Sequence, residues 1–228
     1  IRRTQSKEIE GFGPMFHGTV LYDRQERRFR VWYRALTFVQ PQIFNHLYAW
    51  SEDGVDWTKP KLDIVGPDNR FDPPRYKDGH AGGWLSLRKD TDEPDPKKRY
   101  KGFIQRDPYW HVTSADGLHW RQLQPNPVIT KGAFDSQNNA FWSVSEKRYV
   151  CYFRVFRDGK RWIARTTSKD FVNWTDPVDL DLGGQPREHL YTNQFDPYVR
   201  APHIYLALPT RYLPGRRVLT DEEAKRIG

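Results

Sequence analysis

The stretch SADGLHW at 114–120 decides the fold class, because the same spacing of residue types occurs three times in the chain. SEDGVDW lies at 51–57, and SKDFVNW lies at 168–174. All three fit one pattern: Ser, any residue, Asp, Gly or Phe, Val or Leu, a polar residue and Trp. The second copy begins 63 residues after the first, and the third begins 54 residues after the second. Repeats of this length indicate a chain built from similar structural units.

Segments with the chemistry of β-strands precede each copy. A basic pair followed by an aromatic residue opens the middle segment of every unit. The segments are short, rich in β-branched and aromatic residues, and bounded by charged or Gly/Pro turns, which favours strands over helices. We therefore predict little helix before residue 218, and after it a short helix that Thr220 caps with Glu223. The expected strands are 17–22, 28–36, 46–51, 83–88, 99–105, 109–114, 138–144, 148–155 and 161–168.

Each copy of the repeat, which we call the hairpin motif, is expected to join the third and fourth strands of its unit. The Asp carboxylate accepts backbone N–H groups across the turn, and the Gly in the first two copies supplies a positive φ. The Trp ring then packs between neighbouring sheets. These roles are structural, so we expect the functional site elsewhere. The residues concerned are Asp53, Gly54, Trp57, Asp116, Gly117, Trp120, Asp170 and Trp174.

The composition fits a folded chain whose core is built from aromatic rings. Only 37% of the 228 residues are hydrophobic, but 15% are aromatic and nine are Trp, and each large ring buries much area. Cys151 is the only cysteine, which excludes an internal disulfide. No apolar run is long enough to cross a bilayer, so no membrane partner is expected.

The net charge is +8, from 37 basic and 29 acidic residues. This excess would suit an anionic partner, but the basic residues are scattered and form no strip interleaved with aromatic residues. We therefore expect a solvated basic surface and no nucleic-acid partner. The chain also has no phosphate-binding loop, no dinucleotide-binding glycine pattern and no Ser-His-Asp signature.

Three features resemble the five-bladed β-propeller glycoside hydrolases of families 32, 43 and 117, and bacterial proteins described as family 32 N-terminal-like. They are the hairpin motifs, FDSQNNAFW at 134–142, and LYTNQFDPYVRAPHIYLALPTRY at 190–212. The resemblance implies an all-β, five-bladed β-propeller of which about three and a half blades lie in this sequence. We expect the units near 15–62, 78–125, 135–180 and 188–228 to belong to one propeller domain. The remaining blades, or a second chain segment that supplies them, are an expected partner.

In such propellers the first strand of each blade lines a central channel, and ligands bind at one mouth of it. Asp78, Asp135 and Glu188 lie just before the expected first strands, 57 and 53 residues apart. The resemblance to families 32 and 43 implies that they act as base or nucleophile, orienting acid and proton donor. Glycosidic cleavage needs one protonated and one ionised carboxyl, about 5–10 Å apart. Asp196 is a rival to Glu188 for one of these roles.

The same positions hold candidate substrate-binding residues. Arg200 can keep the carboxyls in different protonation states or bind a substrate carboxylate or sulfate in a bidentate fork, and we expect it to share a pocket with Asp135. Aromatic rings, including Trp142, can stack on sugar faces. The substrate-binding candidates are His17, His80, Trp84, Asn138, Asp196, Tyr198, Arg200 and His203.

The structural alternatives are a turn-capping role for Asp135, and solvated loop positions for Glu188 and Asp78. No two histidines have the short spacing of metal ligands, so we expect no catalytic metal and no cofactor. The resemblance to family 43 leaves a structural Ca²⁺ open.

The sequence departs from family 32, because the Trp-Met-Asn-Asp-Pro-Asn-Gly opening and the Glu-Cys dipeptide are absent. Arg-Asp-Pro at 106–108 is interpreted as a turn. The expected partner is an oligo- or polysaccharide that the protein cleaves. A non-catalytic carbohydrate-binding propeller, or a glycoside phosphorylase that uses Arg200 and Arg211 for phosphate, remain alternatives. The first ten residues show no signal peptide, so the localisation is not readable; a signal peptide in a longer chain would make the protein secreted or periplasmic.

Overall fold

The structure, a computed structural model, describes residues 14–36, 44–71, 85–105 and 109–227. Antiparallel sheets account for most of its regular structure, and α1 (Asp221–Ile227) is the one α-helix in these ranges. Thr220 caps this helix as predicted. Its hydroxyl accepts from the backbone N–H of Glu223 at 3.2 Å, and its own N–H donates to the Glu223 carboxylate at 2.8 Å. The predicted all-β class is confirmed.

Three sheets correspond to the three units predicted from the hairpin motif, and consecutive strands in each pair antiparallel. All nine strands predicted for these units are present, with ends that differ by a few residues. The 3₁₀ turn η1 (Pro96–Lys98) precedes β5. The first unit holds β1 (Pro14–Asp23), β2 (Arg28–Leu36) and β3 (Phe44–Ser51); the second holds β4 (Leu85–Lys89), β5 (Tyr100–Gln105), β6 (Tyr109–Ser114) and β7 (Trp120–Gln122); the third holds β8 (Asn139–Ser143), β9 (Arg148–Arg157), β10 (Lys160–Ser168) and β11 (Val178–Asp179).

The fourth unit differs from its predicted form. It consists of two short ladders, β12 (His189–Leu190) with β15 (Arg211–Tyr212) and β13 (Asp196–Tyr198) with β14 (Ala201–Leu206). The strand that contacts β8 is β13, whereas β12 contacts β10. The first strand of this unit therefore begins at Asp196, and the prediction that Glu188 directly precedes it is wrong. No copy of the hairpin motif occurs in this part of the sequence to set its register.

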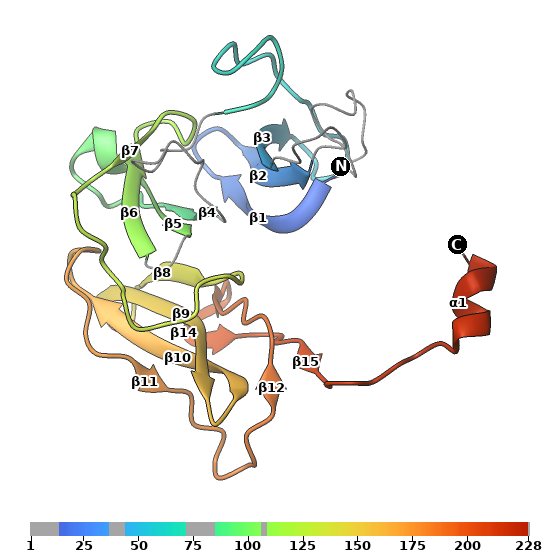
Figure 1. Cartoon of the computed structure of the whole chain (residues 1–228). Helices are drawn as coiled ribbons and strands as arrows, with labels where there is room; N and C mark the ends of the chain where they lie inside the picture. Colours follow the sequence, from blue (N-terminus) through green and yellow to red (C-terminus); the bar gives the residue numbers. More distant parts are fainter. Residues whose placement is uncertain (1–13, 37–43, 72–84, 106–108, 228) are drawn as a thin grey trace.

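The first strands of successive units lie side by side, as they do in a propeller. β1 contacts β4, β4 contacts β8, and β8 contacts β13. Figure 1 shows the first three sheets following one another around the body of the molecule, while the segment after β15 runs away from them and ends in α1. The units are therefore blade-like. A total of five blades, the unit boundaries and the single-domain assignment stay predictions.

The three hairpin motifs adopt the same turn. In each, the Ser hydroxyl bonds to the Asp carboxylate at 2.9 Å. The same carboxylate oxygen accepts the backbone N–H groups two and three residues further on, at 2.7–2.9 Å. The Trp indole N–H donates to the carbonyl of the residue after the Asp, at 2.9–3.2 Å. The predicted role of Asp53, Asp116 and Asp170 is confirmed.

The Trp residues of the motifs are not equally buried. Trp120 is buried in a cluster that includes Trp32 of the first unit, and Trp174 is half-buried against Phe103 of the second unit. Trp57 is half-buried and packs on strands of its own unit. The predicted packing between sheets is therefore confirmed for the second and third motifs; for the first, the described residues show contacts within its own unit only.

A carboxylate, a cation and a tyrosine hydroxyl meet at each interface between consecutive units, and we call these groups the interface ion clusters. In each cluster the tyrosine belongs to the later unit. Its hydroxyl bonds to the cation at the first interface and to the carboxylate at the other two. The clusters tie each unit to the next across the packed sheets. Their members are Asp23, Arg30 and Tyr100 at the first interface, Asp90, Lys101 and Tyr149 at the second, and Glu146, Arg165 and Tyr205 at the third.

Candidate functional site

Residues at or near the starts of the first strands meet across unit boundaries. Gln137, just before β8, donates to the carbonyl of Gly18 in β1 at 3.4 Å. Gln194, just before β13, donates to the side-chain oxygen of Gln137 at 3.4 Å. Arg88, near the carboxyl end of β4, forms an ion pair with Asp196 at the start of β13. Segments separated by more than a hundred residues therefore share one region, as the propeller prediction requires; we call it the channel mouth.

Asp135 is an exposed carboxylate of this region. It lies in the loop before β8 with 72% of its side chain exposed, and it forms an ion pair with Arg154 of β9, whose side chain is only 3% exposed. A buried guanidinium is held in place by its surroundings, so it fixes the carboxylate and stabilises its anionic form. An ionised, solvent-accessible carboxylate can act as a base or a nucleophile, or it can orient a substrate.

Asn138 positions this pair. Its side chain is buried, its amide N–H₂ donates to the carbonyl of Ser136 at 2.7 Å and to the hydroxyl of Tyr109, and its oxygen accepts from the backbone N–H of Arg154 at 2.8 Å. Both ends of the amide are thus used within the protein. These bonds support the loop before β8, and a contact of Asn138 with substrate stays a prediction.

Arg154 takes the place beside Asp135 that was expected for Arg200. Arg200 lies in the exposed turn between β13 and β14. The repeat carries a signal that could have found Arg154: it stands six residues after Arg148, as Arg34 stands six residues after Arg28. Both Arg34 and Arg154 are buried, and burial lowers the pKa of Arg34 to about 10. A buried arginine at this point of the second strand is therefore a shared feature of the first and third units.

The other predicted carboxylates have partners of their own. Glu188, just before β12, accepts from Arg211 at 2.5 Å, and both side chains are exposed. Asp196, at the start of β13, pairs with Arg88 near the end of β4. A catalytic role for either stays a prediction.

The remaining candidates fall into two groups. Tyr198 and His203 are exposed on β13 and β14, and Trp142 packs edge-on against Tyr149 at 4.8 Å in the core between the second and third units. The backbone of His17 lies in β1. Asp78, His80 and Trp84 lie outside the described residues.

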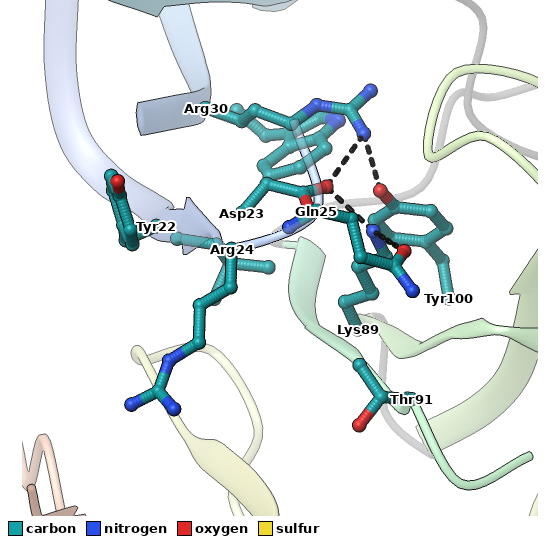
Figure 2. Close-up of a pocket in the computed structure, with 10 residues that line it drawn as sticks. Tyr22, Asp23, Arg24, Gln25, Arg30, Lys89, Thr91 and Tyr100 are labelled. Atoms are coloured by element: carbon teal, nitrogen blue, oxygen red, sulfur yellow. Dashed lines mark hydrogen bonds and ion pairs between the residues drawn. The ribbon is translucent and has the colours of Figure 1, made fainter. Parts of the chain in front are cut away.

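A pocket of about 300 Å³ lies between the first and second units, at the carboxyl ends of β1 and β4 (Figure 2). Trp32 and Tyr100 form part of its wall. Its charged groups pair with one another: Lys89 donates to Asp23 at 2.6 Å, and Arg30 lies 3.7 Å from the same carboxylate. Burial opposes ionisation of Asp23, but the bond from Lys89 and two backbone N–H groups lower its pKa overall. The pocket belongs to the first interface ion cluster and holds one carboxylate, so it lacks the pair that glycosidic cleavage needs.

No group of three or more His, Cys, Asp or Glu side chains is arranged to hold a metal ion in the described ranges. A structural Ca²⁺ therefore gains no support there and stays a prediction. Among the same residues, no helix is long and apolar enough to cross a membrane.

Comparison with solved structures identifies the architecture. A family 117 glycoside hydrolase from Zobellia galactanivorans superposes with a TM-score of 0.57 at 14% identity, over 83% of this chain and 53% of that one. An endo-1,4-β-xylanase from Bacteroides thetaiotaomicron gives 0.56 at 12% identity, over 93% and 76%. An N-acetylgalactosamine deacetylase from F. plautii gives 0.51 at 14% identity, over 81% and 59%.

The chain shares the fold of these three structures. The resemblance read from the hairpin motifs is thereby confirmed at the level of the fold. No protein-family model matches the sequence, and no curated protein is significantly similar to it. The chain spans little more than half the length of two of the three structures described.

Proposed function

We propose that the protein acts on a carbohydrate as a glycoside hydrolase, with Asp135 as a catalytic residue at the channel mouth. One observation carries the proposal: an exposed carboxylate is held by a buried arginine where the first strands of different units meet. Neighbours in the comparison that share this fold are described as a glycoside hydrolase and a xylanase, which supports a saccharide as the substrate.

The reaction requires a second carboxyl across the sugar ring from the first. Asp135 is held in its ionised form by Arg154, so it suits the orienting or nucleophilic role and not that of the proton donor. We assign the donor to Asp78, Glu188 or Asp196. Glu188 and Asp196 each have an arginine partner that a bound substrate would have to displace before either could protonate a leaving group.

The test is the Asp135→Asn variant on a panel of nitrophenyl glycosides and plant and algal oligosaccharides. We expect it to lose turnover by about a thousandfold or more while its melting temperature and its affinity for the cleaved sugar stay close to wild type. Asp158→Asn is the matched control, because Asp158 is an exposed carboxylate in the β9–β10 turn that pairs with Arg187. Full activity of Asp135→Asn would remove Asp135 from the mechanism.

Two other functions use the same mouth. A carbohydrate-binding propeller is favoured by the arginine pairing of Glu188 and Asp196, since paired carboxylates are poor proton donors. It predicts sugar binding without turnover by wild-type protein. A phosphorylase would require inorganic phosphate for turnover and would release a sugar phosphate. Arg200, which is exposed, could bind that phosphate.

We also propose that further propeller units cover the fourth unit. Three apolar side chains at and just after β14 are 45–86% exposed: Ile204, Leu206 and Leu208. Apolar side chains gathered in one strand region are normally covered. In a chain that includes further propeller units, this segment should be protected from proteolysis. Unchanged cleavage there would contradict the proposal.

A further inference from the structure

Arg161, beside the channel mouth, has no carboxylate partner among the residues that the structure describes. It is the second residue of β10, next to the β9–β10 turn. Its Nε atom is buried without a hydrogen-bond partner in those same residues. The neighbouring arginines differ, because each has an acidic partner. These pairs are Arg154 with Asp135, Arg157 with Asp179, Arg187 with Asp158 and Asp179, and Arg211 with Glu188.

Three aromatic rings surround the Arg161 guanidinium. Its central carbon lies 4.7 Å from the ring centre of Tyr212, 5.4 Å from that of Tyr191 and 5.8 Å from that of Phe156. Cation–π contacts at these distances orient the guanidinium and replace part of its hydration. The rings are themselves 39–49% exposed. They therefore leave aromatic surface open to a ligand beside a fixed positive charge.

This cluster is continuous with the loop that carries Asp135. The ring of Tyr191 also lies 5.7 Å from the guanidinium carbon of Arg154, so it stands close to both arginines. The hydroxyl of Ser136, the residue after Asp135, donates to the carbonyl of Tyr191 at 3.2 Å. On the other side, the backbone N–H of Arg161 donates to Nδ1 of His189 at 3.2 Å. A ligand bound at Asp135 can therefore extend over Tyr191 to Arg161.

We propose that Arg161, with Tyr191 and Tyr212, forms a subsite for an anionic sugar residue, one that carries a carboxylate or a sulfate. The proposal rests on the proposed function, since it names the substrate class of the same mouth. The planar guanidinium donates two parallel N–H groups to the anion, and a tyrosine ring stacks on the apolar face of the sugar. A neutral sugar could use the rings but would leave the guanidinium without an acceptor.

Binding is measured by calorimetry on the whole chain with four probes: trigalacturonic acid, its neutral methyl ester, a sulfated agaro-oligosaccharide and the same oligosaccharide without sulfate. We expect wild type to prefer at least one anionic probe about tenfold or more over its neutral counterpart, and the preference to weaken at high salt. The acid pair and the sulfate pair show which anion the site takes. Equal affinity within both pairs would overturn the proposal.

Variants at Arg161 measure what its guanidinium contributes to the preference for an anionic probe. Arg161→Gln should remove most of the preference while neutral probes lose less than about twofold, and Arg161→Lys should keep only part of it, because an ammonium lacks the fork. Arg157→Gln is the matched control on the same hairpin, since Arg157 already pairs with Asp179. An undiminished preference for the anionic probe in Arg161→Gln would contradict the proposed subsite.

Failure of the subsite is distinguishable from failure of the proposed function. Turnover that depends on Asp135 but shows no anion preference retains the hydrolase and rejects the subsite. Anion preference that depends on Arg161, without turnover of any probe, retains the subsite and rejects the hydrolase.

Discussion

The first and second interfaces between units use the same geometry with different residues. At the first, Trp32 of β2 lies over the hairpin motif of the second unit and donates its indole N–H to the carbonyl of Gly117 at 2.6 Å. At the second, Phe103 of β5 stacks on Phe171 of the third motif, with ring centres 4.8 Å apart. Gly117 and Phe171 hold the same place in the motif, and both have a positive φ, of 82° and 65°.

The difference shows that, at each interface, the size of the ring on β2 or β5 and the size of the motif residue opposite it compensate for each other. A Cβ at Gly117 would lie 2.7 Å from Cζ2 of Trp32, so the large ring requires a glycine opposite it. The smaller Phe103 leaves room that the ring of Phe171 fills. Phe171 therefore occupies a backbone conformation that suits glycine, and the burial of its ring, which is 2% exposed, offsets that cost.

The largest expected effect follows from removing the ring at the second interface. Phe171→Ala should lower the free energy of unfolding by about 4 kcal/mol, because it opens a cavity between two units and keeps the positive φ. Phe171→Gly should be about 1 kcal/mol more stable than Phe171→Ala, since glycine tolerates that φ. Denaturant titration followed by Trp fluorescence measures both. A glycine variant as stable as wild type would show that the ring contributes no more than the backbone strain that it offsets.

The next effect tests the first interface. Gly117→Ala should cost about 3 kcal/mol, from backbone strain together with the clash against Trp32. Gly159→Ala is the control, because Gly159 also has a positive φ (71°) but has open space around its Cβ position. The difference between the two variants, read from the same titration, measures the steric part alone. Equal losses of unfolding free energy in the two variants would mean that Trp32 can move away from the new methyl group at no energetic cost.

Loss of a tyrosine hydroxyl from the interface ion clusters should have a smaller effect. Tyr149→Phe removes the bond to Asp90 and should cost about 1–2 kcal/mol. Burial raises the pKa of Tyr149 to about 12, so the hydroxyl remains a donor at neutral pH.

The matching change at the first interface should cost less. In Tyr100→Phe, Arg30 keeps the Tyr48 hydroxyl and the Asp116 carbonyl, both at 2.8 Å. Thermal melts would compare the two variants with Tyr22→Phe, whose ring is exposed and which should be neutral. A larger loss of melting temperature for Tyr100→Phe than for Tyr149→Phe would contradict the expectation that the first interface depends less on its tyrosine hydroxyl.

The smallest effect is a change in pH dependence that should be the same at both interfaces. Burial opposes ionisation of Asp116 and of Asp170, but backbone and side-chain bonds from the turn lower the pKa of each to about 2. A depressed native pKa gives stability that is present above about pH 4 and lost as the pH falls toward 2.

Asp116→Asn and Asp170→Asn should therefore be less stable than wild type at neutral pH, and the gap should close between about pH 4 and 2. Denaturant midpoints measured across that pH range give the dependence of stability on pH. A gap that stays constant with pH in either variant would show that the charge of that Asp does not stabilise the turn.

The candidate site was less predictable from the sequence than the fold, as Asp135 and its neighbours show. Its place before the first strand of a unit follows from the repeat, and the structure holds its carboxylate beside the buried Arg154. Its partner Arg154 was missed in favour of Arg200, and the bonds that the Asn138 amide makes to support the loop were missed as well. The cluster around Arg161 combines residues from β9, β10, β15 and the segment directly after β12, which no local pattern links.

The sequence by itself determined what depends on neighbours in the chain. Strand alternation and turn chemistry act within a few residues, so the nine strands, the three hairpin motifs and the cap at Thr220 could be read directly. Only the tertiary structure decided which units meet and what each brings to the contact. β12, directly after Glu188, contacts β10, and Trp32 selects Gly117, because these contacts depend on how strands of different units pack together. Arg154 reaches Asp135 within the third unit, where β8 pairs with β9.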